Sequence, residues 1–307
     1  MLPKLFETYS EQEIYDARYK NLGANPGESQ KIPAILHHIL LTNSNNPQDI
    51  PEESIKHTIN IIKLFSKDVI NNWQIKIWIN NPDALTHSKT ELEPLGVKFH
   101  SIFEVKMSEE MSSNVNFVID HEYWGMGSDA LRYLIISQFG GFYADLGADF
   151  YRAPGLDLYK YDFIANQWSG ILIANNFFAA KNDHPALEIT KKIVEENLSD
   201  LECIKDVTTG LTAEPFNTGF YSNFFAHFGN TSSSIDVVIP HSKFHNNKNL
   251  YCDGIDPDSP RCDLYDSNFP FITCSDICAA DYVYIGQDAL AGEIWYNKTT
   301  NQINHEE

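Results

Sequence analysis

The sequence has little positive charge. Its 307 residues include 22 Lys and Arg against 42 Asp and Glu, which gives a formal net charge of −20. A surface this acidic repels nucleic acid and anionic membranes, so neither is expected as a partner. It also repels phosphorylated small molecules, so a nucleotide site would need a divalent cation between carboxylates and phosphates. The alternative is that the charge serves solubility alone.

Long hydrophobic runs are also missing. No apolar stretch approaches the roughly 18 residues that a membrane-spanning helix requires. The first 20 residues are charged throughout and lack the apolar region of a secretory signal peptide. We therefore expect no membrane span, and a protein that acts in the cytosol of its own cell or, after delivery, of a host cell.

Cysteine is scarce, and four of the five cysteines lie late in the chain, at Cys252, Cys262, Cys274 and Cys278. Their spacing lacks the two tight pairs of a structural zinc site, so we expect reduced thiols first, disulfides second and zinc last. The sequence also contains no P-loop, no GxGxxG motif and no nucleophile elbow.

Strand and helix patterns alternate in the first half of the chain. Apolar runs predict strands at 32–41, 72–83 and 97–102, and an amphipathic pattern predicts a helix over 53–66. This order predicts an α/β fold with a mostly parallel sheet. Without a recognisable linker we expect one domain over 1–307. It would comprise a helical extension at 1–30, a core at 31–240 and a loop-rich C-terminal part at 241–307.

The segment "MGSDALRYLIISQFGG" predicts a helix that Ser128 caps and that Gly140 ends in the left-handed conformation. "FYADL" then predicts a strand that presents Asp145 at its end. Asp129 and Arg132 are three residues apart and share one face of the helix, where they could be no more than a surface ion pair. Ligands of open α/β sheets bind beyond the carboxyl ends of strands, so Asp145 suits a hydroxyl or a metal, unless it is only a turn residue.

The stretch "SDALRYLIISQFGGFYADLG" resembles the core signature of glycosyltransferases with a DXD-containing sugar-binding region. That family includes bacterial surface-polysaccharide and yeast mannosyl-type transferases, and its relatives include the clostridial glucosylating toxins. Its pattern runs S-D-x-x-R, an apolar helix, then G-G-x-Y-x-D-x-D. The residues that match it are Ser128, Asp129, Arg132, Gly140, Gly141, Tyr143 and Asp145. Similarity extends to "IPAILHHIL", "NWQIKIWINN", "NNFFAAKNDHPAL", "TTGLTAEPFNTGF", "VVIPHSKFHN" and "AGEIWYN".

The resemblance implies a GT-A fold, a Rossmann-like α/β architecture with flanking helices. It further implies transfer of a sugar from a UDP- or GDP-sugar to an acceptor hydroxyl, with retention of configuration and with Mn²⁺ or Mg²⁺ as cofactor. Asp129 and Arg132 would hold the donor sugar, and Asp145 would contact ribose and the metal shell. The residues expected to line the nucleotide-sugar pocket are Trp78, Tyr143, Asn175, Asn176 and Trp295.

The sequence departs from the family pattern at Gly147, where the second Asp of DXD is expected. In one interpretation the metal site survives, with Asp145, Asp149 and either Asp288 or Glu293 as ligands. In the other the metal site is weakened, and the protein is a catalytically weak or inactive binder of nucleotide sugars. For an active enzyme, the acceptor is expected on a host protein, which would make the chain a toxin-like effector. A bacterial surface polysaccharide is the alternative acceptor.

Overall fold

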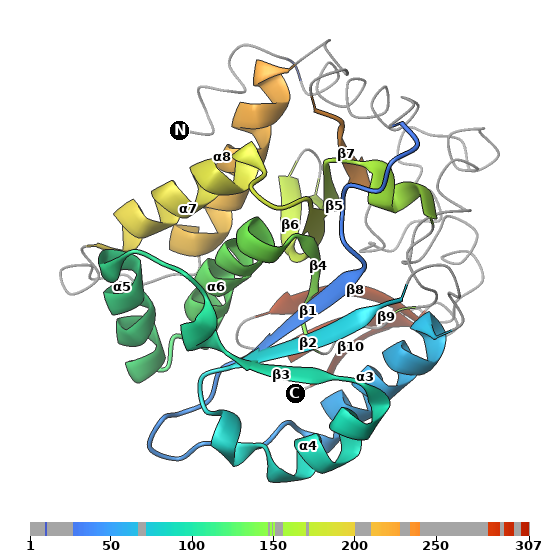
Figure 1. The fold of residues 1–307 in the computed structure, drawn as a ribbon, viewed down its shortest axis with the longest axis vertical. Helices are drawn as coiled ribbons and strands as arrows, with labels where there is room; N and C mark the ends of the chain where they lie inside the picture. Colours follow the sequence, from blue (N-terminus) through green and yellow to red (C-terminus); the bar gives the residue numbers. More distant parts are fainter. Residues whose placement is uncertain are drawn as a thin grey trace.

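The computed structural model describes residues 10, 27–66, 72–146, 148, 150, 156–169, 172–199, 210–227, 234–239, 282–288, 292–297 and 302–306. Most of the expected N-terminal extension and all five cysteines lie outside these residues. Within the described part, a central sheet has helices on both of its faces (Figure 1). Among the helices that the structure describes, none is long and apolar enough to cross a membrane.

The main sheet has seven strands in the order β3-β2-β1-β4-β6-β5-β7. Four of its pairings are parallel, and the two pairings made by β6 are antiparallel. The prediction of a mostly parallel sheet is therefore confirmed. The strands are β1 (Ile35–Leu40), β2 (Gln74–Ile79), β3 (Lys98–Ser101), β4 (Gly141–Ala144), β5 (Phe163–Ser169), β6 (Leu172–Ala180) and β7 (Asp236–Ile239).

Two groups of helices cover the sheet. Residues of α5, α6, α7 and α8 pack in one hydrophobic cluster, and residues of α3 and α4 pack in a second cluster on the other face. These helices are α3 (Glu52–Phe65), α4 (Thr86–Leu92), α5 (Glu109–Asp120), α6 (Trp124–Phe139), α7 (Pro185–Leu198) and α8 (Gly210–Ala226). A separate three-stranded antiparallel sheet contains β8 (Tyr282–Asp288), β9 (Gly292–Asn297) and β10 (Gln302–Glu306).

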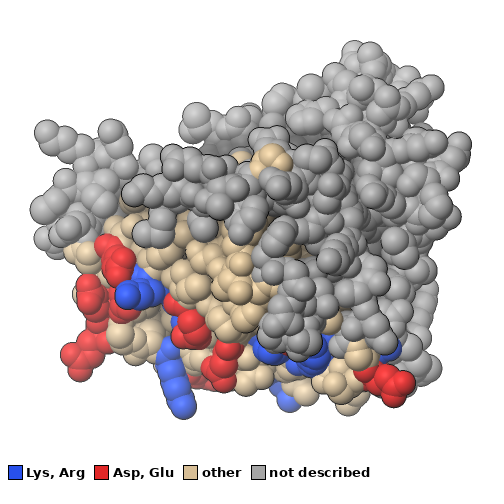
Figure 2. Space-filling view, turned by 90° about the horizontal axis from the view of Figure 1, so that it is seen from above, with Lys and Arg blue, Asp and Glu red and all other residues tan. Residues whose placement is uncertain are grey.

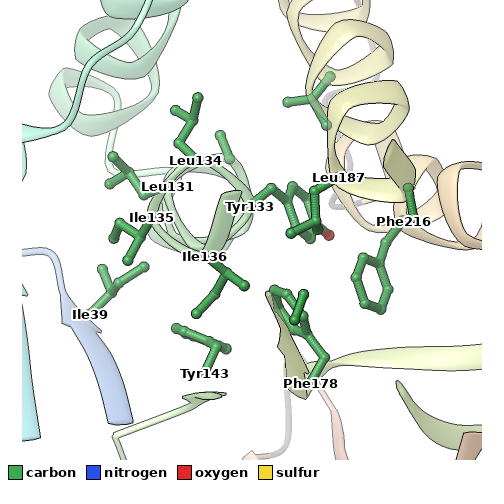
Figure 3. Packing of buried hydrophobic residues seen from close by; sticks show 14 of the residues in the cluster. Ile39, Leu131, Tyr133, Leu134, Ile135, Ile136, Tyr143, Phe178, Leu187 and Phe216 are labelled. Carbon is green, nitrogen blue, oxygen red and sulfur yellow. The ribbon is translucent and has the colours of Figure 1, made fainter. Parts of the chain in front are cut away.

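Helix α6 is buried on nearly every side, because its sequence is apolar around most of its circumference. Ile39 and Tyr143 of the sheet lie against it from below, and Leu187 of α7 and Phe216 of α8 lie beside it (Figure 3). Burying a side chain such as Leu131 contributes roughly 1.5–3 kcal/mol, so this packing fixes the helix firmly against the strands. The polar residues that α6 carries are thereby held in place.

The Gly-Gly pair between α6 and β4 is required by space and by backbone angles. Gly140 has φ 62° and Gly141 has φ 103°, a region that side-chain-bearing residues rarely adopt. A Cβ on Gly141 would lie 2.6 Å from the carbonyl oxygen of Ile35, so glycine allows β4 to lie against β1. The expectation for Gly140 was wrong in detail, since its ψ of −172° places it outside the left-handed helical region.

The expected N-terminus of α6 was also wrong. The helix begins at Trp124, one turn before Ser128, and its N-cap Tyr123 makes no side-chain capping bond. Ser128 therefore lies inside the helix, where its hydroxyl is available to the polar residues of the site.

Helix α8 was not foreseen, because Pro215 lies inside it. A proline removes the N–H that would bond to the carbonyl four residues earlier, which here belongs to Leu211. The side chain of Asn197 supplies the missing donor and bonds to this oxygen at 2.8 Å. A tertiary contact from α7 thus offsets a local sequence signal against a helix.

Candidate active site

The predicted site residues Asp129, Arg132 and Asp145 meet at the carboxyl end of β4. Asp145 follows this strand directly, and its backbone N–H donates to the carbonyl of Asn176 on β6 at 3.0 Å. Its side chain is 39% exposed, whereas those of Asp129 and Arg132 are 8% and 7% exposed. Of these three charged groups, Asp145 is therefore the one that a ligand can reach from solvent.

Arg132 connects the two carboxylates. Its Nη2 lies 3.3 Å from an oxygen of Asp129 and 3.3 Å from Oδ1 of Asp145. The same nitrogen donates to the hydroxyl of Ser128 at 2.9 Å, and Nη1 donates to the carbonyl of Asn175 at 2.9 Å. The planar guanidinium suits this use because its N–H groups point in fixed directions. The pair is thus a buried network, and the surface ion pair considered from the sequence is excluded.

Tyr143 lies beneath Arg132, with the guanidinium carbon 4.5 Å from the ring centroid. Its hydroxyl donates to Oδ1 of Asp145 at 2.8 Å and lies 3.3 Å from the hydroxyl of Ser128. Tyr143 is itself 1% exposed. In the structure it therefore orients Asp145 and supports Arg132.

Asp129 has hydrogen-bond donors on both of its oxygens. Asn175 donates from Nδ2 to Oδ1 at 2.8 Å, and Thr212 on α8 donates its hydroxyl to Oδ2 at 2.8 Å. The same Asn175 nitrogen lies 2.7 Å from the hydroxyl of Tyr133, which donates to the carbonyl of Thr212 at 3.1 Å. Helices α6 and α8 and strand β6 therefore converge on one carboxylate.

The electrostatics follow from burial. Burial raises the pKa of Asp129, partly offset by Arg132, and it raises the pKa of Tyr133 and Tyr143 well above the usual range. Burial alone would lower the pKa of Arg132, but the adjacent Tyr143, Asp145 and Asp129 raise it. At neutral pH the tyrosines are therefore protonated donors and Arg132 is a fixed cation.

A bulge in β6 contains two asparagines and lies beside this cluster. The register between β5 and β6 shifts between Ala165 and Asn166, which leaves Asn175 and Asn176 in the bulged stretch. Bulges re-aim side chains and are over-represented next to active sites. Both asparagines expected at the site thus lie beside it, Asn175 bonded to Asp129 and Asn176 opposite Asp145.

The adjacent histidines of β1 are both fully buried. His37 accepts a hydrogen bond from the indole of Trp78 at 2.9 Å and donates from Nε2 to Gly140. His38 donates from Nδ1 to the carbonyl of Ala144 at 2.8 Å, where β4 ends. Burial lowers the pKa of His37 to about 3 and that of His38 to about 4, so both are neutral and act as structural bridges between strands.

Trp78 belongs to the core in this structure. It is 1% exposed, and its ring stacks on those of His37 and His100. Contact with a bound nucleotide would require these neighbours to move apart, so we do not include Trp78 in the site proposed below.

A cavity of about 360 Å³ lies at the carboxyl end of β1, where Leu40 and the residues after it contribute to its wall. Polar side chains of the loop after β1, among them Asn46 and Gln48, line it together with Glu122 and Trp124. Trp124 is four residues before Ser128, one turn away along α6. The wall of the cavity thus contains an indole, amides and the carboxylates of Asp49 and Glu122, whereas Asp129, Arg132 and Asp145 do not line it.

Several residues of the predicted metal and nucleotide sites lie wholly or with their side chains outside the described structure. Gly147 and Asp149 lie outside the described residues. Asp288 lies on β8, and Glu293 and Trp295 lie on β9, but the positions of their side chains are also outside what the structure describes. Within the described part of the chain, no three His, Cys, Asp or Glu side chains are grouped so as to hold a metal ion.

Sequence reasoning missed Thr212, Tyr133 and the hydroxyl of Ser128 as members of the network. Thr212 is 83 residues from Asp129 in the chain. The only sequence signal for it was the resemblance of "TTGLTAEPFNTGF" to a stretch of the family, which does not indicate a partner.

The chain is similar in sequence to a curated protein and in fold to a solved glycosyltransferase structure. No protein-family model matches the chain. A segment of 162 residues is 28% identical to inositol phosphoceramide mannosyltransferase 1 of Schizosaccharomyces pombe, covering 53% of this chain and 42% of that protein. The solved PaToxG glycosyltransferase superposes with a TM-score of 0.52 at 15% identity, over 71% of this chain and 79% of that one.

The chain has the GT-A fold of glycosyltransferases. This confirms the fold that the sequence resemblance implied. The ligand-free glycosyltransferase domain from the YGT toxin gives a TM-score of only 0.39 at 11% identity, over 76% of this chain and 74% of that one, too low to support a shared fold by itself. In this GT-A fold, the cluster around Asp145 lies at the carboxyl ends of β1 and β4, where open α/β sheets bind ligands.

Proposed function

We propose that the chain is a glycosyltransferase that moves a sugar from a UDP- or GDP-sugar to an acceptor hydroxyl. The observation that carries this proposal is the network of Asp129, Arg132 and Asp145 at the carboxyl end of β4 in a GT-A fold. A buried Asp–Arg pair behind one exposed carboxylate gives a fixed polar surface, which is what positioning of a sugar donor requires.

The residues of the network have separate tasks in this proposal. Oδ1 of Asp145 is occupied by Tyr143 and Arg132, and no partner of Oδ2 is found among the described residues. Asp145 thus presents one oxygen to a ribose hydroxyl or a cation. Arg132, fixed by Ser128 and Asn175, offers positive charge to the donor sugar or to the departing phosphate.

A divalent cation, Mn²⁺ or Mg²⁺, fits the chemistry of these groups. Carboxylate and amide oxygens are ligands that hard cations prefer, and both occur here, at Asp145, whose side chain is 39% exposed, and at Asn176, whose amide oxygen is buried. When bound, such a cation acts as a Lewis acid that stabilises charge on the diphosphate. In a chain with net charge −20, it also offsets the repulsion between the protein and an anionic donor.

The cavity at the carboxyl end of β1 supports binding of the nucleoside part of the donor. Its indole, Trp124, offers a stacking surface, and the amides of Asn46 and Gln48 can both donate and accept hydrogen bonds.

We further propose that transfer proceeds with retention and that the acceptor is a hydroxyl on a host protein. Similarity to the PaToxG glycosyltransferase and to a yeast mannosyltransferase agrees with sugar transfer, but these two are different kinds of protein. A surface polysaccharide is the alternative acceptor. Labelling of proteins in a host-cell lysate with radioactive donor tests this point, and the absence of any labelled protein would contradict a host-protein acceptor.

The function is tested by hydrolysis of UDP- and GDP-sugars in the presence of Mn²⁺, with Asp145→Ala as the comparison. We expect the wild type to release nucleoside diphosphate only when Mn²⁺ is present. The variant should lose at least about 100-fold in rate, as is typical when a transition-state contact is removed. Hydrolysis that persists in Asp145→Ala, or that needs no metal, would contradict the assignment.

The second candidate function is a binder of nucleotide sugars without turnover. The observation in its favour is Gly147, which stands where a second carboxylate of the motif is expected. Binding of a nucleotide sugar with no hydrolysis and no transfer would support this candidate over the enzyme.

A further inference from the structure

Asn176 has a side-chain oxygen with no hydrogen-bond partner among the residues that the structure describes. Its Oδ1 is buried and accepts no hydrogen bond from the residues that the structure describes. The neighbouring Asn175, in contrast, donates to Asp129 and Tyr133. Buried polar atoms without a partner are rare in native proteins, and such an atom beside a candidate site indicates a missing ligand, ion or water.

This oxygen belongs to the residue that faces Asp145. The N–H of Asp145 donates to the backbone carbonyl of Asn176 at 3.0 Å, directly after the register pair of Ala144 with Phe177. Ala144 and Phe177 both pack on the α3 side of the sheet. Counted from Ala144 and Phe177, alternation places Asp145 and Asn176 on the α6 side. Asn175 faces the same side because the bulge interrupts the alternation between the two asparagines.

We propose that Asn176 Oδ1 and Asp145 together are protein ligands of the divalent cation, so that Asn176 replaces the carboxylate missing at Gly147. This inference rests on the proposed function and specifies its cation site. Amide and carboxylate oxygens are both common ligands of hard divalent cations. The amide, however, contributes no charge, and affinity for such cations depends on how many charged ligands the site has.

A consequence is that the cation binds weakly to the protein alone and tightly together with a nucleoside diphosphate. The diphosphate oxygens supply the negative charge that the amide lacks. The cation and the nucleotide therefore bind cooperatively, and each increases the affinity for the other by the same factor.

The test is titration of each protein with MnCl₂, followed by calorimetry and by the electron paramagnetic resonance signal of free Mn²⁺. Asn176→Asp should tighten binding of Mn²⁺ alone, and Asn176→Ala should weaken it, each by at least about tenfold. Asn114→Ala is the matched control, because Asn114 on α5 also has a buried side-chain atom without a partner in the described structure. Its affinity for Mn²⁺ should equal that of the wild type.

The result that would overturn the inference is an affinity for Mn²⁺ that is the same in Asn176→Ala, Asn176→Asp and wild type. If Asn176→Ala instead raises the KM for the donor while Mn²⁺ binding is unchanged, Asn176 contacts the sugar and the inference is equally wrong. In both cases the proposed function stands, provided that wild type still hydrolyses a donor with Mn²⁺. If wild type neither binds Mn²⁺ nor hydrolyses any donor, the proposed function itself fails.

Discussion

At the scale of single residues, Asp129 shows how a buried charge is kept in place. Its side chain is 8% exposed, and its oxygens accept from Asn175 and Thr212 while Arg132 lies 3.3 Å away. An isolated buried carboxylate would be strongly unfavourable, whereas a paired and hydrogen-bonded one is tolerated. The direction that Asp129 faces is therefore set by its partners, and Thr212 is a positioning residue rather than a catalytic one.

Thr212→Val tests this role, because it keeps the shape of the side chain and removes only the hydroxyl. Loss of the donor leaves Oδ2 of Asp129 unsatisfied, which should lower the free energy of unfolding by about 1–3 kcal/mol. Urea denaturation measures this change. Donor hydrolysis should fall through a lower kcat as Asp129 loses its fixed orientation.

Thr212→Ser is the matched control, since it retains the hydroxyl and should restore the kinetics even if it loses some packing. If Thr212→Val and Thr212→Ser give the same kinetics, the hydroxyl has no part in positioning Asp129.

The residues of the site differ in how far the sequence could reveal them. Asp129, Arg132 and Asp145 could be predicted through the family resemblance, because their spacing alone also allowed a surface ion pair and a turn residue. Thr212 could not, because its contact with Asp129 depends on how α8 docks against α6, which local sequence does not encode. The hydroxyl of Ser128 was assigned to a cap because the true start of α6 at Trp124 has no capping side chain.

At the scale of elements, the site depends on how closely β4 approaches β1. The two strands pair in parallel, and a Cβ on Gly141 would lie 2.6 Å from the carbonyl oxygen of Ile35. Gly141 also has a positive φ of 103°. The end of β4 that presents Asp145 is therefore placed by a residue without a side chain.

Gly141→Ala should destabilise the fold for two reasons, strain at positive φ and overlap with β1. We expect a loss of about 3 kcal/mol or more in the free energy of unfolding, the sum of the two effects. Gly96→Ala is the matched control, because Gly96 has φ 92° but no atom within 4 Å of the added Cβ, so only strain remains. Equal losses in the two variants, measured by urea denaturation, would show that close approach of the strands is unimportant.

The elements were predictable where their pattern is local. The strands at β1, β2 and β3 and the helix at α3 follow from alternation and apolar runs. Helix α8 could not be predicted, since Pro215 argues against a helix and the compensating donor comes from α7. The bulge that aims Asn175 and Asn176 also depends on pairing with β5 and leaves no clear local signal.

At the scale of the whole molecule, charge decides what can bind. Figure 2 shows acidic and basic side chains interspersed on the described part of one face, with uncharged surface between them. With a net charge of −20, the chain offers a diphosphate no long-range attraction, so binding must depend on local groups. Arg132 and a divalent cation at Asp145 would supply the local positive charge that a diphosphate needs.

The measurement that tests this account most directly is the melting temperature with UDP- and GDP-sugars, with and without Mn²⁺. A ligand that binds the folded state raises the melting temperature by mass action, by an amount equivalent to about 2.7 kcal/mol at 100 times its Kd. We predict a rise for at least one donor only when Mn²⁺ is present, and no rise for Asp145→Ala. A rise that needs no Mn²⁺, or one that Asp145→Ala retains, would contradict a cation-dependent donor site at the end of β4.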